Sequence, residues 1–218
     1  MSTMVTFPKM ASLLFCFFLA TIVNASPNLV ALVGGPGCGK TTLLQALAQK
    51  GFKTLPESST MVIQEERALG NIEPWKQREL FQTKILNRQL DLLAGVKNFE
   101  GLVFSDRGIP DGIAYFYFDE LTPFAELLTE SQNTRYDLVF LLDFLDNYNL
   151  DNTIRHEAPA EALEIHALIK KVYEDLGYIL IVVPAMSVEE RVALVLSALT
   201  SGPKHSTRPE PKMPQQVG

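Results

Sequence analysis

Residues 34–41 have the composition and spacing of a phosphate-binding loop. They read Gly34-Gly35-Pro36-Gly37-Cys38-Gly39-Lys40-Thr41, a full match to G-x-x-x-x-G-K-[ST], and Thr42 follows them. In such a loop the glycines let backbone N–H groups point at one anion, and the next helix adds its partial positive charge. Lys40 is expected to reach the β- and γ-phosphates of a bound ATP or GTP, and Thr41 to ligate Mg²⁺. The alternative is a plain glycine turn between a strand and a helix.

Asp106 and Arg107 could extend this chemistry. Asp106 follows the apolar run 102–105, where a carboxylate would hold Mg²⁺ through water or orient an attacking hydroxyl. Arg107 could pair with a phosphate or with a substrate. The alternatives are an aspartate that caps the next helix and an arginine in a structural salt bridge. We therefore expect Asp106 to be a metal ligand beside Thr41 and Arg107 to be a catalytic residue.

Three further charged residues are candidates for acting on a substrate. Glu57 lies just past an expected strand and is a candidate general base for a substrate hydroxyl. Asp111 could contact substrate or cap a helix. Arg155 closes a polar segment after residues 137–142, where small-molecule kinases carry a lid whose arginine reaches the transferred phosphoryl group. A surface glutamate at 57 and a surface ion pair between Arg155 and Glu157 are the simpler alternatives.

Aromatic and cationic side chains elsewhere have simpler interpretations. The cluster 115–118 and Trp75 could stack a base, although such side chains more often belong to the core. Lys76, Arg78 and Arg88 are most simply the solvated face of a long helix.

These residues need a scaffold that brings them together, and the hydrophobic pattern predicts one. Apolar runs at 28–33, 102–105, 137–142 and 178–183 and the short segment 52–55 predict strands, and residues 42–50, 61–68, 75–94, 110–118, 159–176 and 187–199 predict helices. Strands that are apolar throughout and alternate with helices indicate a three-layer α/β fold, with a five-stranded parallel sheet flanked by helices. Ligands of such sheets gather at the carboxyl ends of the strands. Asp106 and Glu57 are therefore expected beside the phosphate loop.

Bulk composition limits the possible partners. The 218-residue chain has a formal net charge of −6, which does not favour a nucleic-acid partner. Its two cysteines, one in the apolar N-terminal stretch and one in the phosphate loop, offer no disulfide framework. The three histidines lack metal-site spacing, so any metal is expected to be shared with a ligand.

The ends of the chain are expected to lie outside the folded domain. Residues 1–25 resemble a secretory signal peptide, with a basic start, the apolar run 11–23 and small residues before a cleavage point after Ala25. Residues 28–199 form the expected domain, and the proline-rich tail 200–218 is expected to be disordered. A membrane contact is expected only through the N-terminal segment, if it is uncleaved. The signal-like segment suggests export, whereas the fold suggests the cytoplasm.

The chain resembles the P-loop AAA-type domain shared by the nicotinamide riboside kinase half of NadR and the TRPL translocation defect proteins. The matching pieces are the phosphate loop with Thr42, Pro56-Glu57, residues 106–111, residues 136–141, the segment around Arg155 and residues 173–178. The resemblance implies a P-loop NTPase with a nucleotide-kinase-like sheet, ATP or GTP binding and Mg²⁺. The chain departs from it in its signal-like N-terminus and in lacking the adenylyltransferase domain of bifunctional NadR.

Three functions remain open at this point. The first is a Mg²⁺-dependent phosphotransferase, a kinase that acts on a small hydroxylated metabolite or nucleoside. The second is a nucleotide-binding switch or adaptor with slow NTP hydrolysis. The third is an exported effector that uses the fold for binding only. The sequence alone does not identify the acceptor and does not choose between ATP and GTP.

Overall fold

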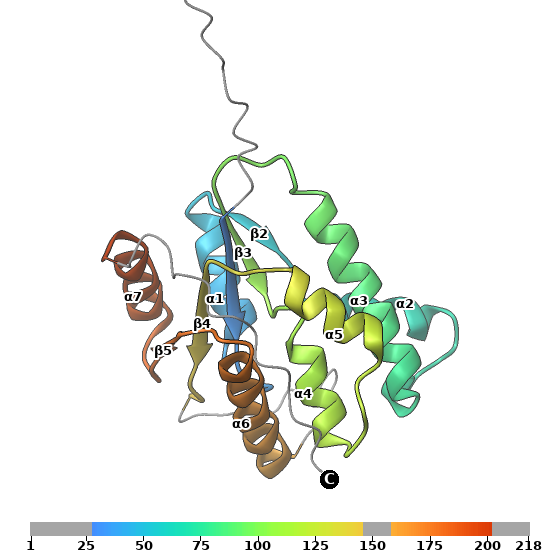
Figure 1. Cartoon of the computed structure of the whole chain (residues 1–218). Helices are drawn as coiled ribbons and strands as arrows, with labels where there is room; N and C mark the ends of the chain where they lie inside the picture. Colours follow the sequence, from blue (N-terminus) through green and yellow to red (C-terminus); the bar gives the residue numbers. More distant parts are fainter. Residues whose placement is uncertain (1–27, 146–157, 202–218) are drawn as a thin grey trace, which may run out of the picture.

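The five segments expected to be strands do form strands, and in the computed structural model they make one parallel sheet (Figure 1). The model describes residues 28–145 and 158–201. The strands are β1 (Asn28–Val33), β2 (Lys53–Leu55), β3 (Leu102–Asp106), β4 (Leu138–Leu142) and β5 (Leu180–Val183). Their spatial order is β2-β3-β1-β4-β5, and every pairing is parallel. The expected three-layer α/β fold is therefore confirmed.

Helices cover both faces of the sheet in the described residues. They are α1 (Lys40–Gln49), α2 (Ser58–Ala68), α3 (Arg78–Ala94), α4 (Asp111–Phe118), α5 (Ala125–Asn133), α6 (Pro159–Asp175) and α7 (Val188–Ser201). Alternate residues of β1 feed two separate cores. Ala31 and Val33 pack with side chains of α4 and α6, whereas Val30 and Leu32 pack with α1 and α7. Both faces of the central strand are thus dry, as its unbroken apolar sequence predicts.

Two elements differ from the expectation. The helix expected from residue 75 to 94 is split, because Gln77 has non-helical dihedral angles (φ −103°, ψ 72°) between a 3₁₀ turn, Pro74–Lys76, and α3. The helix α5 was not expected. Its sequence AELLTESQN is mostly polar, and it buries only Leu127 and Ser131, so its apolar periodicity is too weak to predict a helix.

The ends of two other helices agree with the sequence. Ser187 and Glu190 form a capping box before α7, where the Glu190 N–H donates to Ser187 Oγ (3.3 Å) and the Ser187 N–H to Glu190 Oε2 (2.9 Å). Gly51 follows α1 with φ 91°. The capping box lies at the start of α7, and Gly51 lies just past the end of α1.

Several expectations fall on residues outside the described part of the chain. The signal-like segment 1–25, the polar segment that contains Arg155 and most of the tail 200–218 are among them. Within residues 28–145 and 158–201, no helix combines the length and the apolar character needed to cross a membrane.

Candidate functional site

The phosphate loop connects β1 to α1 at the carboxyl edge of the sheet. Gly34 (φ 136°), Gly37 (φ 86°) and Gly39 (φ 81°) have backbone conformations that side chains rarely adopt. A Cβ atom on Gly34 would also lie 2.8 Å from the carbonyl oxygen of Leu142. The backbone conformation of this turn therefore requires glycine at these three positions. An ordinary turn between a strand and a helix would not need glycine at this spacing.

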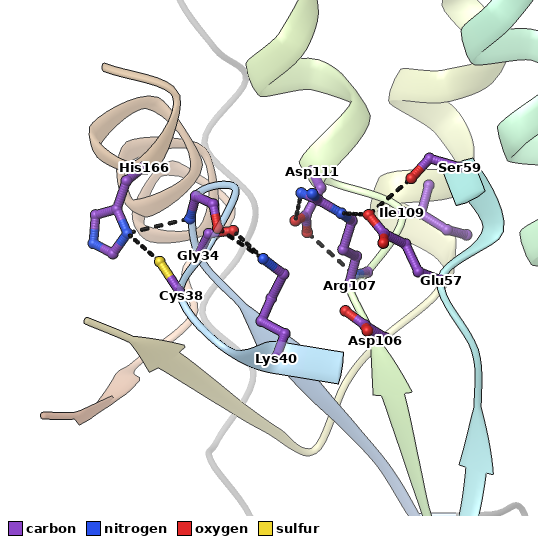
Figure 2. A network of polar contacts seen from close by, with 12 residues as sticks. Gly34, Cys38, Lys40, Glu57, Ser59, Asp106, Arg107, Ile109, Asp111 and His166 are labelled. Carbon is purple, nitrogen blue, oxygen red and sulfur yellow. Dashed lines mark hydrogen bonds and ion pairs between the residues drawn. The ribbon is translucent and has the colours of Figure 1, made fainter. Parts of the chain in front are cut away.

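Lys40, the first residue of α1, folds back over this loop. Its side chain is 4% exposed, and Nζ donates to the carbonyl oxygens of Gly34 (2.9 Å) and Gly35 (2.8 Å). Burial, followed by the nearby Arg107, lowers the pKa of Lys40. A buried ammonium without a close carboxylate favours an anion beside it. Lys40 is thus oriented as a phosphate-binding lysine would be (Figure 2).

Thr41 and Asp106 meet across the strands β1 and β3. The register that pairs Leu32 with Asp106 brings the carboxylate to the start of α1, and Thr41 Oγ1 donates to Asp106 Oδ2 at 2.6 Å. Asp106 is 2% exposed, and its Oδ1 has no hydrogen-bond partner in the described residues. Burial, together with the carboxylate of Glu57, raises the pKa of Asp106 to about 6. An orphaned carboxylate oxygen beside a threonine hydroxyl fits a hard cation such as Mg²⁺.

Arg107 lies at the centre of a charge network that joins three elements (Figure 2). Its φ of 73° is unusual for a residue with a side chain. The Arg107 backbone N–H donates to the Leu32 carbonyl (3.0 Å), which anchors the turn after β3. Its guanidinium donates to Glu57 Oε1 (2.6 Å) and to Asp111 Oδ1 (3.5 Å). The strained backbone thus aims the guanidinium at two carboxylates.

The carboxylate of Glu57 accepts hydrogen bonds from several side chains, unlike a general base that is free to take a proton. Besides Arg107, the hydroxyl of Ser59 donates to Oε1 (2.8 Å) and that of Thr60 to Oε2 (2.9 Å). Burial alone would raise the pKa of Glu57, but the charges of Arg107 and Lys40 outweigh it and lower the pKa to about 2. A carboxylate of this kind holds a proton poorly at neutral pH. It is better suited to accept a hydrogen bond from a hydroxyl and so to orient it.

Asp111 fixes the turn between β3 and α4. Its Oδ2 accepts from the Gly108 N–H (3.1 Å) and from the Tyr173 hydroxyl of α6 (2.8 Å). A Cβ on Gly108 would lie 2.2 Å from that hydroxyl. Burial raises the pKa of Asp111, and Arg107 opposes the rise. Both interpretations of Asp111, as a capping residue and as a residue facing a ligand, are compatible with this geometry.

A cavity of about 560 Å³ opens beside these residues, between α2, α3 and α4. Thr41, Glu57, Arg107 and Asp111 line one part of it. Its other lining residues include an aromatic and polar set from the helices: Trp75, Arg78, Phe81, Gln82, Gln89 and Tyr115. The spacing of 78, 81, 82, 85 and 89 shows that one face of α3 forms a wall of the cavity. A cavity of this size holds a small organic molecule.

The phosphate loop is also held by side chains of α6 and α7. His166 of α6 accepts a hydrogen bond from the Gly35 N–H at Nδ1 (3.2 Å), and the Cys38 Sγ lies 3.7 Å from the same nitrogen. Burial lowers the pKa of His166, which favours the neutral ring that this contact needs. Arg191 of α7 donates to the carbonyl oxygens of Cys38, Asp143 (2.8 Å) and Pro184 (3.1 Å) and is 2% exposed.

The structure brings most of the sequence-derived candidates into one site. The loop 34–42, Glu57, Asp106 and Arg107 converge at the carboxyl ends of β1, β2 and β3 (Figure 2). Arg155 lies outside the described residues.

Some residues of the site were not found from the sequence. Arg78 had been assigned to a solvated face, but it lines the cavity and pairs with Asp119 (Nη2–Oδ1 3.2 Å). For Trp75 and Tyr115 the sequence left two interpretations open, stacking on a ligand ring or packing in the core, and both residues line the cavity. Gln82, His166 and Arg191 had no role assigned. For Gln82 a signal existed, since it is a polar residue on the buried face of α3.

With the geometry known, the chain can be compared with known proteins. Residues 29–191 match the model of a family described as AAA domain (AAA_28). The chain belongs to this AAA domain family. A search of curated protein sequences found no significant match.

Solved structures show where this AAA domain lies among known folds. A thymidylate kinase from Ehrlichia chaffeensis has a TM-score of 0.56 at 15% identity, over 80% of this chain and 99% of that one. A deoxyadenosine kinase from M. mycoides has a TM-score of 0.58 at 16% identity, over 79% and 99%. NadR in complex with NR has a TM-score of 0.59 at 18% identity, over 79% of this chain and 50% of that one. The AAA domain therefore has the nucleotide-kinase-like P-loop fold.

Proposed function

We propose that this AAA domain protein is a Mg²⁺-dependent phosphotransferase that moves the γ-phosphoryl group of ATP or GTP to a hydroxyl of a small acceptor, such as a nucleoside. One observation carries the proposal. The phosphate loop, the Thr41–Asp106 pair and the Glu57–Arg107 pair all border a cavity large enough for an acceptor. A switch protein that only hydrolyses nucleotide needs no such cavity.

Each residue has a distinct part in the proposed reaction. Lys40 and the loop amides bind the phosphates, and Thr41 with Asp106 holds Mg²⁺, which supplies positive charge to the phosphate oxygens. Glu57 accepts a hydrogen bond from the acceptor hydroxyl and aims its oxygen at the γ-phosphorus. Arg107 holds Glu57 in place. Arg155 stays a predicted lid residue.

The reaction forms one bond and breaks one. The acceptor oxygen bonds to the γ-phosphorus, the bond from that phosphorus to the β–γ bridging oxygen breaks, and the hydroxyl proton is released to solvent. Because the transition state of phosphoryl transfer is loose, orientation matters more than proton removal. This is compatible with a Glu57 whose pKa is about 2.

Transfer of labelled phosphate tests the proposal. The protein would be incubated with γ-labelled ATP or GTP, Mg²⁺ and a panel of nucleosides and hydroxylated metabolites. We expect a labelled product with at least one acceptor, and loss of that product by about 10²-fold or more in Asp106→Asn. Asp91→Asn, at an exposed position of α3, is the matched control. Hydrolysis of bound triphosphate without transfer to any acceptor would instead identify a nucleotide switch.

A further inference from the structure

Gln82 presents to the acceptor cavity an amide that has no hydrogen-bond partner among the described residues. The residue is 4% exposed and lies on the buried face of α3. In the part of the chain that the structure describes, no hydrogen bond or ion pair engages its side chain, although it lines the cavity. An amide that faces a cavity without a protein partner is open to a hydrogen bond from whatever fills the cavity. A ligand in the cavity would supply the missing partner.

The neighbouring helix keeps room for this amide. A Cβ atom on Gly112, at the start of α4, would lie 3.1 Å from Gln82 Oε1 and 3.1 Å from a methyl of Leu127. A larger residue at 112 would therefore crowd the amide. The carboxamide of Gln82 offers one acceptor and two donor hydrogens. It can bind a group in which a donor and an acceptor lie side by side.

The cations that line this cavity are already neutralised. Arg107 is paired with Glu57 and Asp111, and Arg78 is paired with Asp119. Both guanidiniums also lie 5.5 Å from the centre of the Tyr115 ring. Their remaining N–H groups can donate to a neutral hydroxyl. A phosphate or carboxylate on the acceptor would instead meet the carboxylates of Glu57 and Asp111, and repulsion between like charges opposes binding.

Aromatic side chains complete the walls. Trp75, Phe81 and Tyr115 line the same cavity as Gln82. Flat aromatic faces bury a planar ring with little loss of conformational freedom. The cavity thus combines flat apolar walls with the amide of Gln82. Each cation among its described lining residues is paired with a carboxylate.

We propose that Gln82 selects the acceptor, and that the acceptor is an unphosphorylated molecule with a planar ring whose edge presents a hydrogen-bond donor beside an acceptor. The ring edge pairs with the Gln82 amide, and the hydroxyl-bearing part extends to Glu57 and Arg107. This inference rests on the proposed function, since it takes the cavity as the acceptor site. It separates two chemistries that share this fold, transfer to a hydroxyl and transfer to an existing phosphate.

Binding can be measured without turnover, because Trp75 is the single tryptophan of the chain and lines the cavity. The full chain would be titrated with thymidine, adenosine, their 5′-monophosphates and ribose. Tryptophan fluorescence would follow binding, and equilibrium dialysis would check it. We expect thymidine or adenosine to bind, with the monophosphates at least about tenfold weaker and ribose weaker still. In Gln82→Leu the nucleoside should bind about 10- to 100-fold more weakly.

Two variants separate recognition from folding. Gln82→Glu keeps the shape but loses the donor, so it should weaken nucleoside binding and leave ribose binding unchanged. Gln45→Leu makes the same exchange as Gln82→Leu at an exposed position of α1 and should bind like wild type. A purely structural role of Gln82 would lower nucleoside and ribose binding together.

Three results would overturn the inference. They are equal or tighter binding of the monophosphates, unchanged nucleoside affinity in a folded Gln82→Leu protein, and no binding of any nucleoside by either method. Failure of the proposed function looks different, because nucleosides would then bind with the predicted selectivity while no labelled phosphate is transferred.

Discussion

Arg107 and its two carboxylates are the chemical centre of the site. The guanidinium holds Glu57 with one nitrogen and Asp111 with another, and Glu57 also accepts from two hydroxyls. This arrangement keeps Glu57 ionised and fixed in direction. The residue is therefore better suited to orient a hydroxyl than to take its proton, because a pKa of about 2 makes it a weak proton acceptor.

The first prediction concerns the stability contributed by Glu57. Its pKa is depressed from 4.5 to about 2 in the folded protein, so its stabilisation is fully present above the unfolded pKa and is lost as the pH falls through the folded pKa. Replacing it by glutamine leaves Arg107 with one carboxylate fewer. We expect Glu57→Gln to lower the free energy of unfolding by about 3 kcal/mol at neutral pH. The difference should shrink as the pH falls from 4.5 towards 2.

Denaturant unfolding at a series of pH values measures this difference. Glu65→Gln removes a carboxylate of an exposed ion pair with Arg88 and should cost less than about 1 kcal/mol. A gap between Glu57→Gln and wild type that does not change with pH would rule out the ion pair as its source.

The sequence predicts some of these residues and not others, for a physical reason. Asp106 and Glu57 each follow a predicted strand, and parallel strands end at one edge, so their convergence with the loop could be predicted. Arg78 and Gln82 lie within a helix. Which face of that helix meets the cavity depends on how it packs against α2 and α4, and the sequence pattern does not contain that information.

Helices α6 and α7 support the phosphate loop from outside the cavity. His166 contacts Gly35 and Cys38, and Arg191 binds the carbonyls of Cys38, Asp143 and Pro184. These contacts join the loop to the ends of β4 and β5. The loop is therefore held by contacts within the protein itself, which lowers the cost of ordering it on binding.

The second prediction tests this support. Arg191→Met removes the donors for three carbonyl oxygens, and each buried acceptor left unpaired costs about 1 kcal/mol or more. We expect a loss of about 3 kcal/mol in unfolding free energy and weaker nucleotide binding. Arg88→Met, at a surface ion pair of α3, is the control. If a folded Arg191→Met protein bound nucleotide as tightly as wild type, the hydrogen bonds of Arg191 would not be needed for the loop to bind nucleotide.

Strands and helices with a clear hydrophobic pattern were predicted from the sequence, and those with a weak hydrophobic pattern were not. Four of the strands were predicted because each is a short apolar run closed by polar residues, glycine or proline, whereas β2 is short and contains Lys53 and Thr54. The helix α5 was missed because it presents little apolar surface. The break at Gln77 could not be predicted. It results from the non-helical backbone conformation of this residue, and position 77 is neither a proline nor a glycine, which would have indicated a break.

At the scale of the whole molecule, two cores on either side of the sheet belong to one domain. Side chains of β1 and β4 contribute to both, so the layers should unfold together. We predict that a fragment of residues 28–201 unfolds in one transition at the midpoint of the full chain, as seen by calorimetry. A fragment that is unfolded or melts at a much lower temperature would show that the flanking residues are part of the fold.

The N-terminal segment can be assigned by peptide mapping of protein from its native cells. If residues 1–25 are a cleaved signal peptide, the chain should begin near Ser26. Intact Met1 in the membrane fraction would indicate an anchor. Intact Met1 in the supernatant would contradict both interpretations and strengthen the case for a cytosolic kinase.

The central claim is that the loop 34–42 binds the phosphates of a Mg²⁺-nucleotide, and calorimetric titration with a non-hydrolysable triphosphate tests it most directly. Lys40→Ala removes a buried cation from the loop, and a charge-assisted contact of this kind is worth about 1.5–3 kcal/mol. We predict about 10- to 100-fold weaker binding than wild type, whereas Lys50→Ala at the exposed end of α1 should leave the affinity unchanged. Equal affinity of a folded Lys40→Ala protein and the wild type would contradict the assignment of the loop.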